Sequence, residues 1–133
     1  MPGLIADTHA TLWYLSKSPK LSATAFARMQ STVAGGDPIF VPTISIVEVV
    51  YLVEKGRVPS EALDRIYHHL DQPDSGLVLV PLDEGVARTV NRISRDKVPD
   101  MPDRLIAATA LYWDLPLVTH DRDIRDAGIP TIW

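Results

Sequence analysis

The chain has 133 residues, a formal net charge of −4 and no cysteine. This length fits one domain with a substantial buried core, spanning residues 1–133. The lack of cysteine excludes disulfides, thiolate metal sites and cysteine nucleophiles, so any metal ion must bind through oxygen or histidine. No apolar run approaches the roughly 20 residues of a membrane helix, and the first residues do not resemble a signal peptide. We therefore expect a cytoplasmic protein with no membrane partner.

Short apolar runs alternate with helical patterns along the chain. Strands are predicted at residues 3–6, 39–41, 77–80, 117–118 and 131–133. Helices are predicted at residues 8–15, 22–33, 43–56, 60–70, 83–94 and 102–115, with one further turn at 123–126. This alternation implies a parallel sheet that is covered by helices on both faces. The predicted fold class is therefore α/β, with a central parallel sheet of about five short strands.

Capping residues set the predicted helix boundaries. Ser22, Thr43 and Ser60 stand where N-caps belong, and Gly56 stands where the third helix should close. Segment 43–56 (TISIVEVVYLVEKG) is ambiguous, because its β-branched residues favour a strand. Its apolar residues do not alternate strictly, however, and its length and caps favour a helix.

Residues 102–121 (PDRLIAATALYWDLPLVTHD) are predicted to form a helix followed by a strand. Pro102 suits the first turn of a helix, and Asp103 follows it. The helix is apolar nearly all the way round, so it should be buried against a sheet. Asp121 comes shortly after the strand at 117–118. In a βαβ arrangement the start of a helix and the end of a strand share one edge of the sheet, so we expect the two aspartates to meet.

Further acids are expected at the same edge. Asp7 ends the first strand, and Glu48 lies early in its helix, roughly 7 Å along it and within side-chain reach. Ligand sites in open parallel sheets lie beyond the carboxyl ends of the strands. The candidate catalytic and metal-binding residues are therefore Asp7, Glu48, Asp103 and Asp121.

Taken singly, three of these acids also have ordinary structural roles. Asp7 can cap the following helix, the helix dipole favours Asp103 in a first turn, and Asp121 can belong to a turn. Glu48 differs, because its neighbours one turn away are apolar and no basic residue lies within helical reach. Its carboxylate therefore needs a partner from elsewhere in the chain.

A divalent cation would resolve the charge conflict at this edge. Carboxylates that gather without cations repel and raise one another's pKa. Ligation by oxygen alone is typical of Mg²⁺, with Mn²⁺ as the alternative cofactor. Such an ion activates water and neutralises charge on a phosphoryl group, which suits the hydrolysis of a phosphodiester.

Several neighbours of the four acids are further candidates. His9 and His120 flank the acids in sequence, and Asp100 and Asp123 are alternatives or additions to Asp103 and Asp121. The hydroxyl of Thr119 is a candidate to orient Asp121 through a hydrogen bond. The net charge argues against a uniformly basic surface but not against a local contact to nucleic acid. Basic residues that are candidates for phosphate contacts are Arg92, Arg95, Lys97, Arg104, Arg122 and Arg125.

Three segments together resemble a known family. They are LIADTHATLWYL at the start, SIVEVVYLVEKG in the middle and PDRLIAATALYWDLPLVTHDRDI near the end. In this order they resemble the PIN-domain ribonucleases, and within that family the VapC toxins of toxin–antitoxin pairs. The resemblance covers the chain nearly end to end. Each segment alone is weak, but the ordered set is specific.

The resemblance implies a three-layer α/β/α PIN fold and metal-dependent endoribonuclease activity. It also implies inhibition by a cognate VapB-like antitoxin, and a homodimer is usual in the family. The family's acidic quartet falls on Asp7, Glu48, Asp103 and Asp121, the same four residues that the sheet-edge argument selects. The resemblance also favours a helix at 43–56.

Two other functions remain open at this point. In the first, the protein binds RNA or an antitoxin with little or no catalysis, and the two cases differ in whether RNA is cut or only bound with Mn²⁺ present. In the second, Asp7 is the nucleophile of a phosphatase. That class usually has a second aspartate two positions later, where this chain has His9.

Overall fold

The computed structural model describes residues 2–133. The strands are Leu4–Ala6 (β1), Ile39–Pro42 (β2), Leu77–Val80 (β3), Leu117–Val118 (β4) and Thr131–Ile132 (β5). The helices are Thr8–Ser16 (α1), Ala23–Ala34 (α2), Thr43–Glu54 (α3), Ser60–Asp71 (α4), Glu84–Thr89 (α5), Met101–Trp113 (α6) and Arg122–Arg125 (α7), with a 3₁₀ turn at Val90–Arg92 (η1). The predicted alternation of strands and helices is confirmed.

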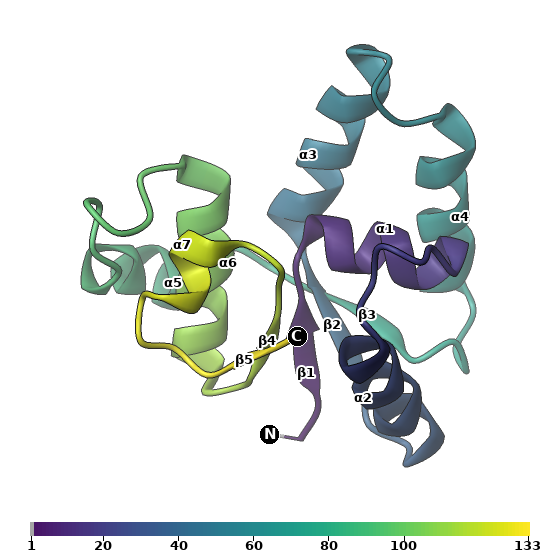
Figure 1. Cartoon of the computed structure of the whole chain (residues 1–133), viewed down its shortest axis with the longest axis horizontal. Helices are drawn as coiled ribbons and strands as arrows, with labels where there is room; N and C mark the ends of the chain where they lie inside the picture. Colours follow the sequence, from purple (N-terminus) through teal and green to yellow (C-terminus); the bar gives the residue numbers. More distant parts are fainter. Residues whose placement is uncertain (1) are drawn as a thin grey trace.

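All five strands are parallel and pair in the order β3-β2-β1-β4-β5. Helices cover both faces of the sheet, with α5, α6 and α7 on one side and α1 and α2 on the other (Figure 1). The predicted three-layer α/β/α architecture is therefore confirmed. Helices α3 and α4 form an antiparallel pair that packs against α1 beyond the edge of the sheet.

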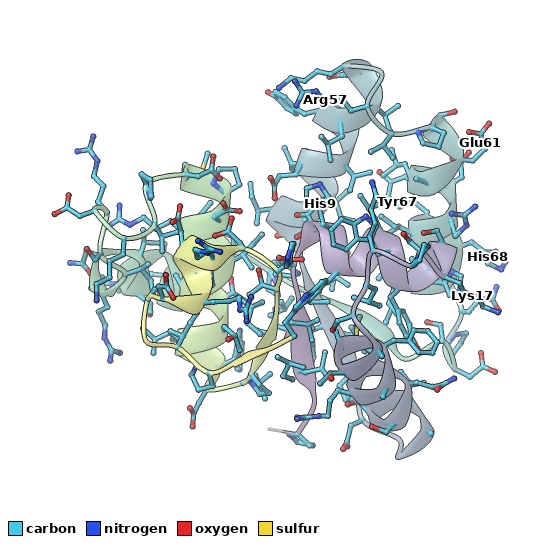
Figure 2. The ribbon with its side chains drawn as sticks, in the orientation of Figure 1. His9, Lys17, Arg57, Glu61, Tyr67 and His68 are labelled. Carbon is cyan, nitrogen blue, oxygen red and sulfur yellow. The ribbon has the colours of Figure 1, made fainter. Side chains whose placement is uncertain are left out.

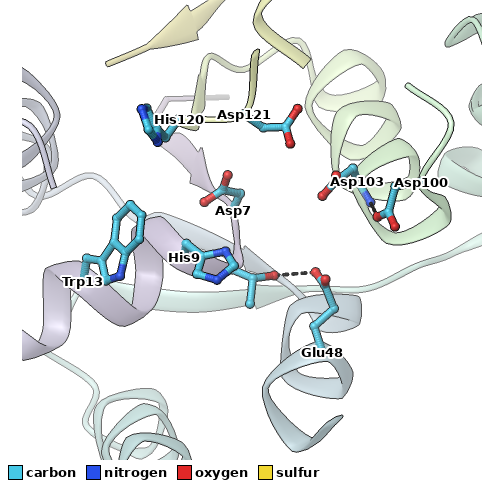
Figure 3. A pocket seen from close by; sticks show the side chains of 9 residues that line it. Asp7, His9, Trp13, Glu48, Asp100, Asp103, His120 and Asp121 are labelled. Carbon is cyan, nitrogen blue, oxygen red and sulfur yellow. Dashed lines mark hydrogen bonds between the residues drawn. The ribbon is translucent and has the colours of Figure 1, made fainter. Parts of the chain in front are cut away.

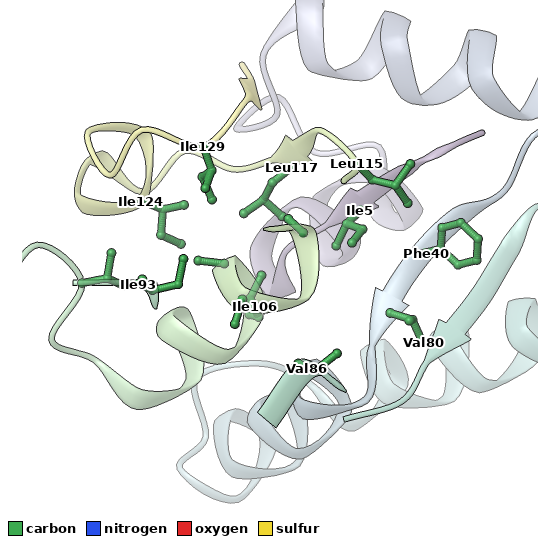
Figure 4. Packing of buried hydrophobic residues seen from close by; sticks show 14 residues of the cluster. Ile5, Phe40, Val80, Val86, Ile93, Ile106, Leu115, Leu117, Ile124 and Ile129 are labelled. Carbon is green, nitrogen blue, oxygen red and sulfur yellow. The ribbon is translucent and has the colours of Figure 1, made fainter. Parts of the chain in front are cut away.

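Successive strand residues point to opposite faces and build two separate cores. Ile5 and Leu117 face α5 and α6, where they pack with Ile106 and Ile124 (Figure 4). The neighbouring strand residues face α1 and α2 instead, where they pack around Met29. The strands are therefore buried on both faces, which explains why they read as continuous apolar runs.

The boundaries of two helices differ from the prediction. Thr43 and Ser60 are not N-caps but the first residues of α3 and α4, and the preceding prolines occupy the cap positions without a side-chain hydrogen bond. Each proline has an extended ψ and serves as the cap, so each helix begins one residue earlier than the predicted caps imply. Ser22 is an N-cap as predicted, because its hydroxyl accepts the Ala25 N–H at 3.0 Å.

The helix predicted at 83–94 is shorter than expected. Asp83 caps α5, which ends at Thr89 and tightens into η1. Gly85 lies where α5 crosses α6, and a Cβ at this position would overlap the ring of Tyr112. The missing side chain therefore allows the close approach of these two helices.

Helix α6 also begins and ends differently from the prediction. It starts at Met101, one residue before Pro102, and Asp100 is its N-cap. It ends at Trp113, because Asp114 adopts the left-handed conformation with φ of 54°. Within residues 2–133, no helix has the length and apolar character needed to cross a membrane.

Candidate functional site

A cavity of about 400 Å³ opens at the carboxyl edge of the sheet (Figure 3). Its acidic lining residues come from separate parts of the chain and include all four acids selected from the sequence. Its lining consists of Asp7, Thr8, His9, Trp13, Glu48, Asp100, Asp103, His120 and Asp121. Of the two acids left open by the sequence, the structure therefore brings Asp100 into the cavity and leaves Asp123 out of its lining.

The sheet topology explains where the cavity lies. Strand β1 is central and pairs with β2 on one side and β4 on the other. Chain segments that leave β1 and β4 must therefore diverge, and such a switch point is where open parallel sheets bind ligands. Asp7 follows β1 directly and Asp121 follows β4 after two residues, so both lie at this point.

Three of the acids are held by hydrogen bonds to the helices that they begin. One oxygen of Asp7 accepts the Ala10 N–H at 2.8 Å at the start of α1. Asp100 accepts the Asp103 N–H at 3.1 Å in α6, and Asp121 accepts an N–H of α7 at 3.0 Å. Each of these caps uses one carboxylate oxygen and fixes the position of the acid at the start of its helix.

Glu48 has the partner that the sequence required but did not identify. The hydroxyl of Thr8 donates to its Oε1 at 2.6 Å (Figure 3). Thr8 is buried and lies in the first turn of α1, so this bond joins α1 to α3 beside Asp7. The hydrogen bond fixes the direction of the Glu48 carboxylate.

The surroundings of Asp7, Glu48 and Asp103 favour the protonated forms of these three acids. Burial raises the pKa of Asp7 and of Glu48. Hydrogen bonds from Thr119 and Ala10 oppose part of the shift at Asp7, and the hydrogen bond from Thr8 does so at Glu48. Burial and the charges of the other four acids of the cavity together raise the pKa of Asp103 to about 7. The Asp103 carboxyl is therefore repelled by every other acid of the cavity when it is ionised.

The donor chemistry of the cavity fits a hard divalent cation. Its lining includes five carboxylates but no lysine or arginine. In residues 2–133, no set of three or more Asp, Glu or His side chains is arranged to hold an ion directly. Because Mg²⁺ keeps several of its waters, one or two of these carboxylates would hold the ion directly and the other acids would hold it through its waters.

Aromatic rings form one wall of the cavity, which the sequence did not predict. The ring of Trp13 lies 5.4 Å from that of His9 and 6.5 Å from that of His120, measured between centroids. Trp133 lies behind them, stacked on His120 at 4.9 Å. The two histidines therefore belong to an aromatic cluster at the edge of the acidic cavity.

The remaining candidates have mostly structural roles. The hydroxyl of Thr119 accepts the backbone N–H of Asp121 at 3.0 Å, so it orients the main chain of this acid. Arg104 donates its Nε–H to the carbonyl of Ile93 at 2.9 Å. Arg122 and its neighbour Arg125 line a different depression. None of the six basic residues proposed from the sequence lines the acidic cavity.

The chain belongs to the PIN-domain family, whose model matches residues 4–130. It is 28% identical over 136 residues to the ribonuclease VapC22 of Mycobacterium tuberculosis, and the match covers the whole of both chains. The resemblance to PIN-domain ribonucleases of the VapC type is therefore confirmed.

Solved structures of toxin–antitoxin complexes share the fold. One is VapBC2 of Rickettsia felis bound to a promoter DNA fragment, with a TM-score of 0.72, 14% identity and coverage of 98% of this chain and 97% of the other. Another is DNA-bound VapBC of Salmonella typhimurium, with a TM-score of 0.72, 20% identity and the same coverage of both chains. At these identities the likeness supports the fold.

Proposed function

We propose that this protein is a Mg²⁺-dependent endoribonuclease, the toxin of a VapBC-type toxin–antitoxin pair. The observation that carries the proposal is the cavity itself, where acids from separate segments meet without a lysine or arginine. Membership of the PIN-domain family and the similarity to a named ribonuclease support the same activity.

The chain's own residues would hold the cation and prepare the site. We assign Asp7, Glu48, Asp103 and Asp121 as the acids that would hold the cation, either directly or through its waters, with Asp100 as a fifth acid of the same cavity. When bound, a hard divalent cation activates water and neutralises negative charge that develops on the phosphodiester. The caps and the Thr8 hydroxyl fix the carboxylates before the ion arrives, so little reorganisation remains at the moment of reaction.

The proton on Asp103 competes with the cation. Because the pKa of Asp103 is about 7, this carboxyl is half protonated near neutral pH when no cation is bound. Cation binding would release that proton, since a carboxylate must be ionised to act as a ligand. The site therefore couples metal binding to pH.

The activity is tested with purified protein and a labelled single-stranded RNA. We expect cleavage with Mg²⁺, its loss in EDTA, and its loss in the variants Glu48→Gln and Asp103→Asn. Asp64→Asn, an exposed acid of α4 outside the cavity, is the matched control and should cleave normally. Cleavage that persists in EDTA would refute the metal mechanism, and RNA that is bound but not cut with Mn²⁺ would favour a binding module.

The partners follow from the toxin assignment. Structural neighbours are complexes of toxin with antitoxin, so we expect a short VapB-like antitoxin encoded beside this chain to bind it and stop cleavage. We also expect a homodimer. Co-purification with the product of the adjacent short gene and light scattering of the isolated protein test these two expectations.

A further inference from the structure

A second cavity of about 420 Å³ continues from the acidic one. The two share His9 and Trp13 as lining residues, so these side chains stand at the junction. The second cavity, here called the α1–α4 groove, lies where α1, the α3–α4 loop and α4 meet. Figure 2 shows His9 at the start of α1 and Arg57 at the far end of the α3–α4 pair.

The α1–α4 groove has the opposite charge to the acidic cavity. Lys20, Arg57 and Arg65 line it, and no acid from residues 2–133 belongs to its lining. Across the same part of the chain, no carboxylate forms an ion pair within 4.0 Å with any of these three cations. A chain with a net charge of −4 therefore concentrates free positive charge directly beside its acids.

Adjacent cavities of opposite charge suit a polyanion that lies in the basic groove and places one of its phosphates at the acids. The acidic cavity takes a phosphate only together with a cation, whereas the groove attracts phosphates directly. Trp13 is half-buried, packs against two hydrophobic clusters and lines both cavities. Aromatic side chains beside basic residues are the usual means of holding single-stranded nucleic acid.

We propose that the α1–α4 groove binds the RNA strand on one side of the cleaved bond. A base stacks on Trp13 and the neighbouring phosphates contact Lys20, Arg57 and Arg65. This inference rests on the proposed function, because it assumes that RNA is the substrate of the acidic cavity. Helix α3 rises about 9 Å between Glu48 and its last residue, Glu54, six positions later. This rise is about the height of three stacked nucleotides.

The test measures RNA binding separately from cleavage. The probe is a 12-nucleotide single-stranded RNA with a fluorescent end label, and anisotropy is recorded in EDTA between 50 and 200 mM KCl. We expect Lys20→Ala, Arg57→Ala and Arg65→Ala each to weaken binding several-fold and to reduce the slope of log K against log salt by about 0.7. Arg28→Ala, an exposed arginine on α2 away from the groove, is the matched control and should bind as the unmodified chain does.

Trp13 is tested by a different signature. Trp13→Ala should weaken binding roughly 5- to 150-fold, the range for loss of one stacked base, without changing the salt slope. Trp13→Phe, which keeps a ring, should bind within about threefold of the unmodified chain. Trp13 also packs on the core, so the alanine variant could fail to fold. In that case Trp13→Leu is measured in its place, and unchanged RNA affinity in either variant would overturn the stacking role.

The outcomes separate this inference from the nuclease proposal. RNA that binds through these residues but is not cut with Mg²⁺ would support the groove and refute the nuclease. Cleavage and binding that are unchanged in the triple cation variant would leave the nuclease standing and overturn the groove. Substitutions that weaken only the binding of an antitoxin would also overturn the groove as an RNA site, because the groove would then bind a protein partner.

Discussion

Replacing Asp103 by asparagine should stabilise the metal-free protein while removing its activity. Burial and four neighbouring acids raise the pKa of Asp103 from its ordinary 3.8 to about 7. The folded state therefore favours the protonated carboxyl, and the protein loses stability as the pH rises from 3.8 through 7. Asparagine has nearly the same shape but no charge, so the variant should not show this loss.

The magnitude follows from the size of the pKa change. A rise of about three pH units corresponds to about 4 kcal/mol if it is converted in full. Asp103 is only half-buried, and solvent screens its interactions, so we expect about half of that, ~2 kcal/mol. For a chain of this length, this is an increase in Tm of about 7 °C at pH 8 in EDTA.

Thermal unfolding at pH 4 and pH 8 measures this effect. The two proteins should melt together at pH 4, where Asp103 is mostly protonated when folded, and separate at pH 8. Mg²⁺ at about 100 times its Kd should stabilise the unmodified chain by about 2.7 kcal/mol and the variant far less. A variant that is less stable than the unmodified chain at pH 8 in EDTA would show that the carboxylates do not repel, and the argument for a cation would fail.

Three further predictions concern the same cavity. Thr8→Val removes the hydroxyl that donates to Glu48, so stability by urea unfolding should fall by about 1 kcal/mol and cleavage by about tenfold. Asp100→Asn should lower cleavage because this acid lines the cavity, whereas Asp123→Asn should not, and equal effects in gel-based rates would contradict the assignment. The Kd for Mg²⁺ should rise by up to about tenfold per pH unit below 7, since the proton on Asp103 competes, and titration calorimetry at pH 6 and 7 measures this. A Kd that is independent of pH would place the cation elsewhere.

The acids could be predicted because one rule connects them. In a parallel sheet, strand ends and helix starts share an edge, and this rule alone brought Asp7, Asp103 and Asp121 together from distant segments. Glu48 joined them because its apolar surroundings demanded a partner. That partner, Thr8, was not predicted, because its hydroxyl meets Glu48 only after α1 and α3 pack.

The aromatic and basic residues around the acids were harder to predict than the acids themselves. Trp13 and Trp133 are 120 positions apart, and nothing local in either segment indicates that their rings lie 6.0 Å from each other. Lys20, Arg57 and Arg65 gather through the packing of α1 and α4, which sequence periodicity does not specify. The basic residues chosen for their closeness in sequence to the acids therefore missed the cavity.

Capping has a consequence for reading related chains. Asp7 and Asp121 begin helices, and loss of such a cap costs about 1 kcal/mol whether or not any RNA is cut. A descendant that had lost all nuclease activity would therefore still lose a helix cap if either residue were replaced by one that cannot cap. Glu48 and Asp103 cap nothing, so substitutions at these two positions are the better indicator that a PIN domain of this type no longer acts as an enzyme.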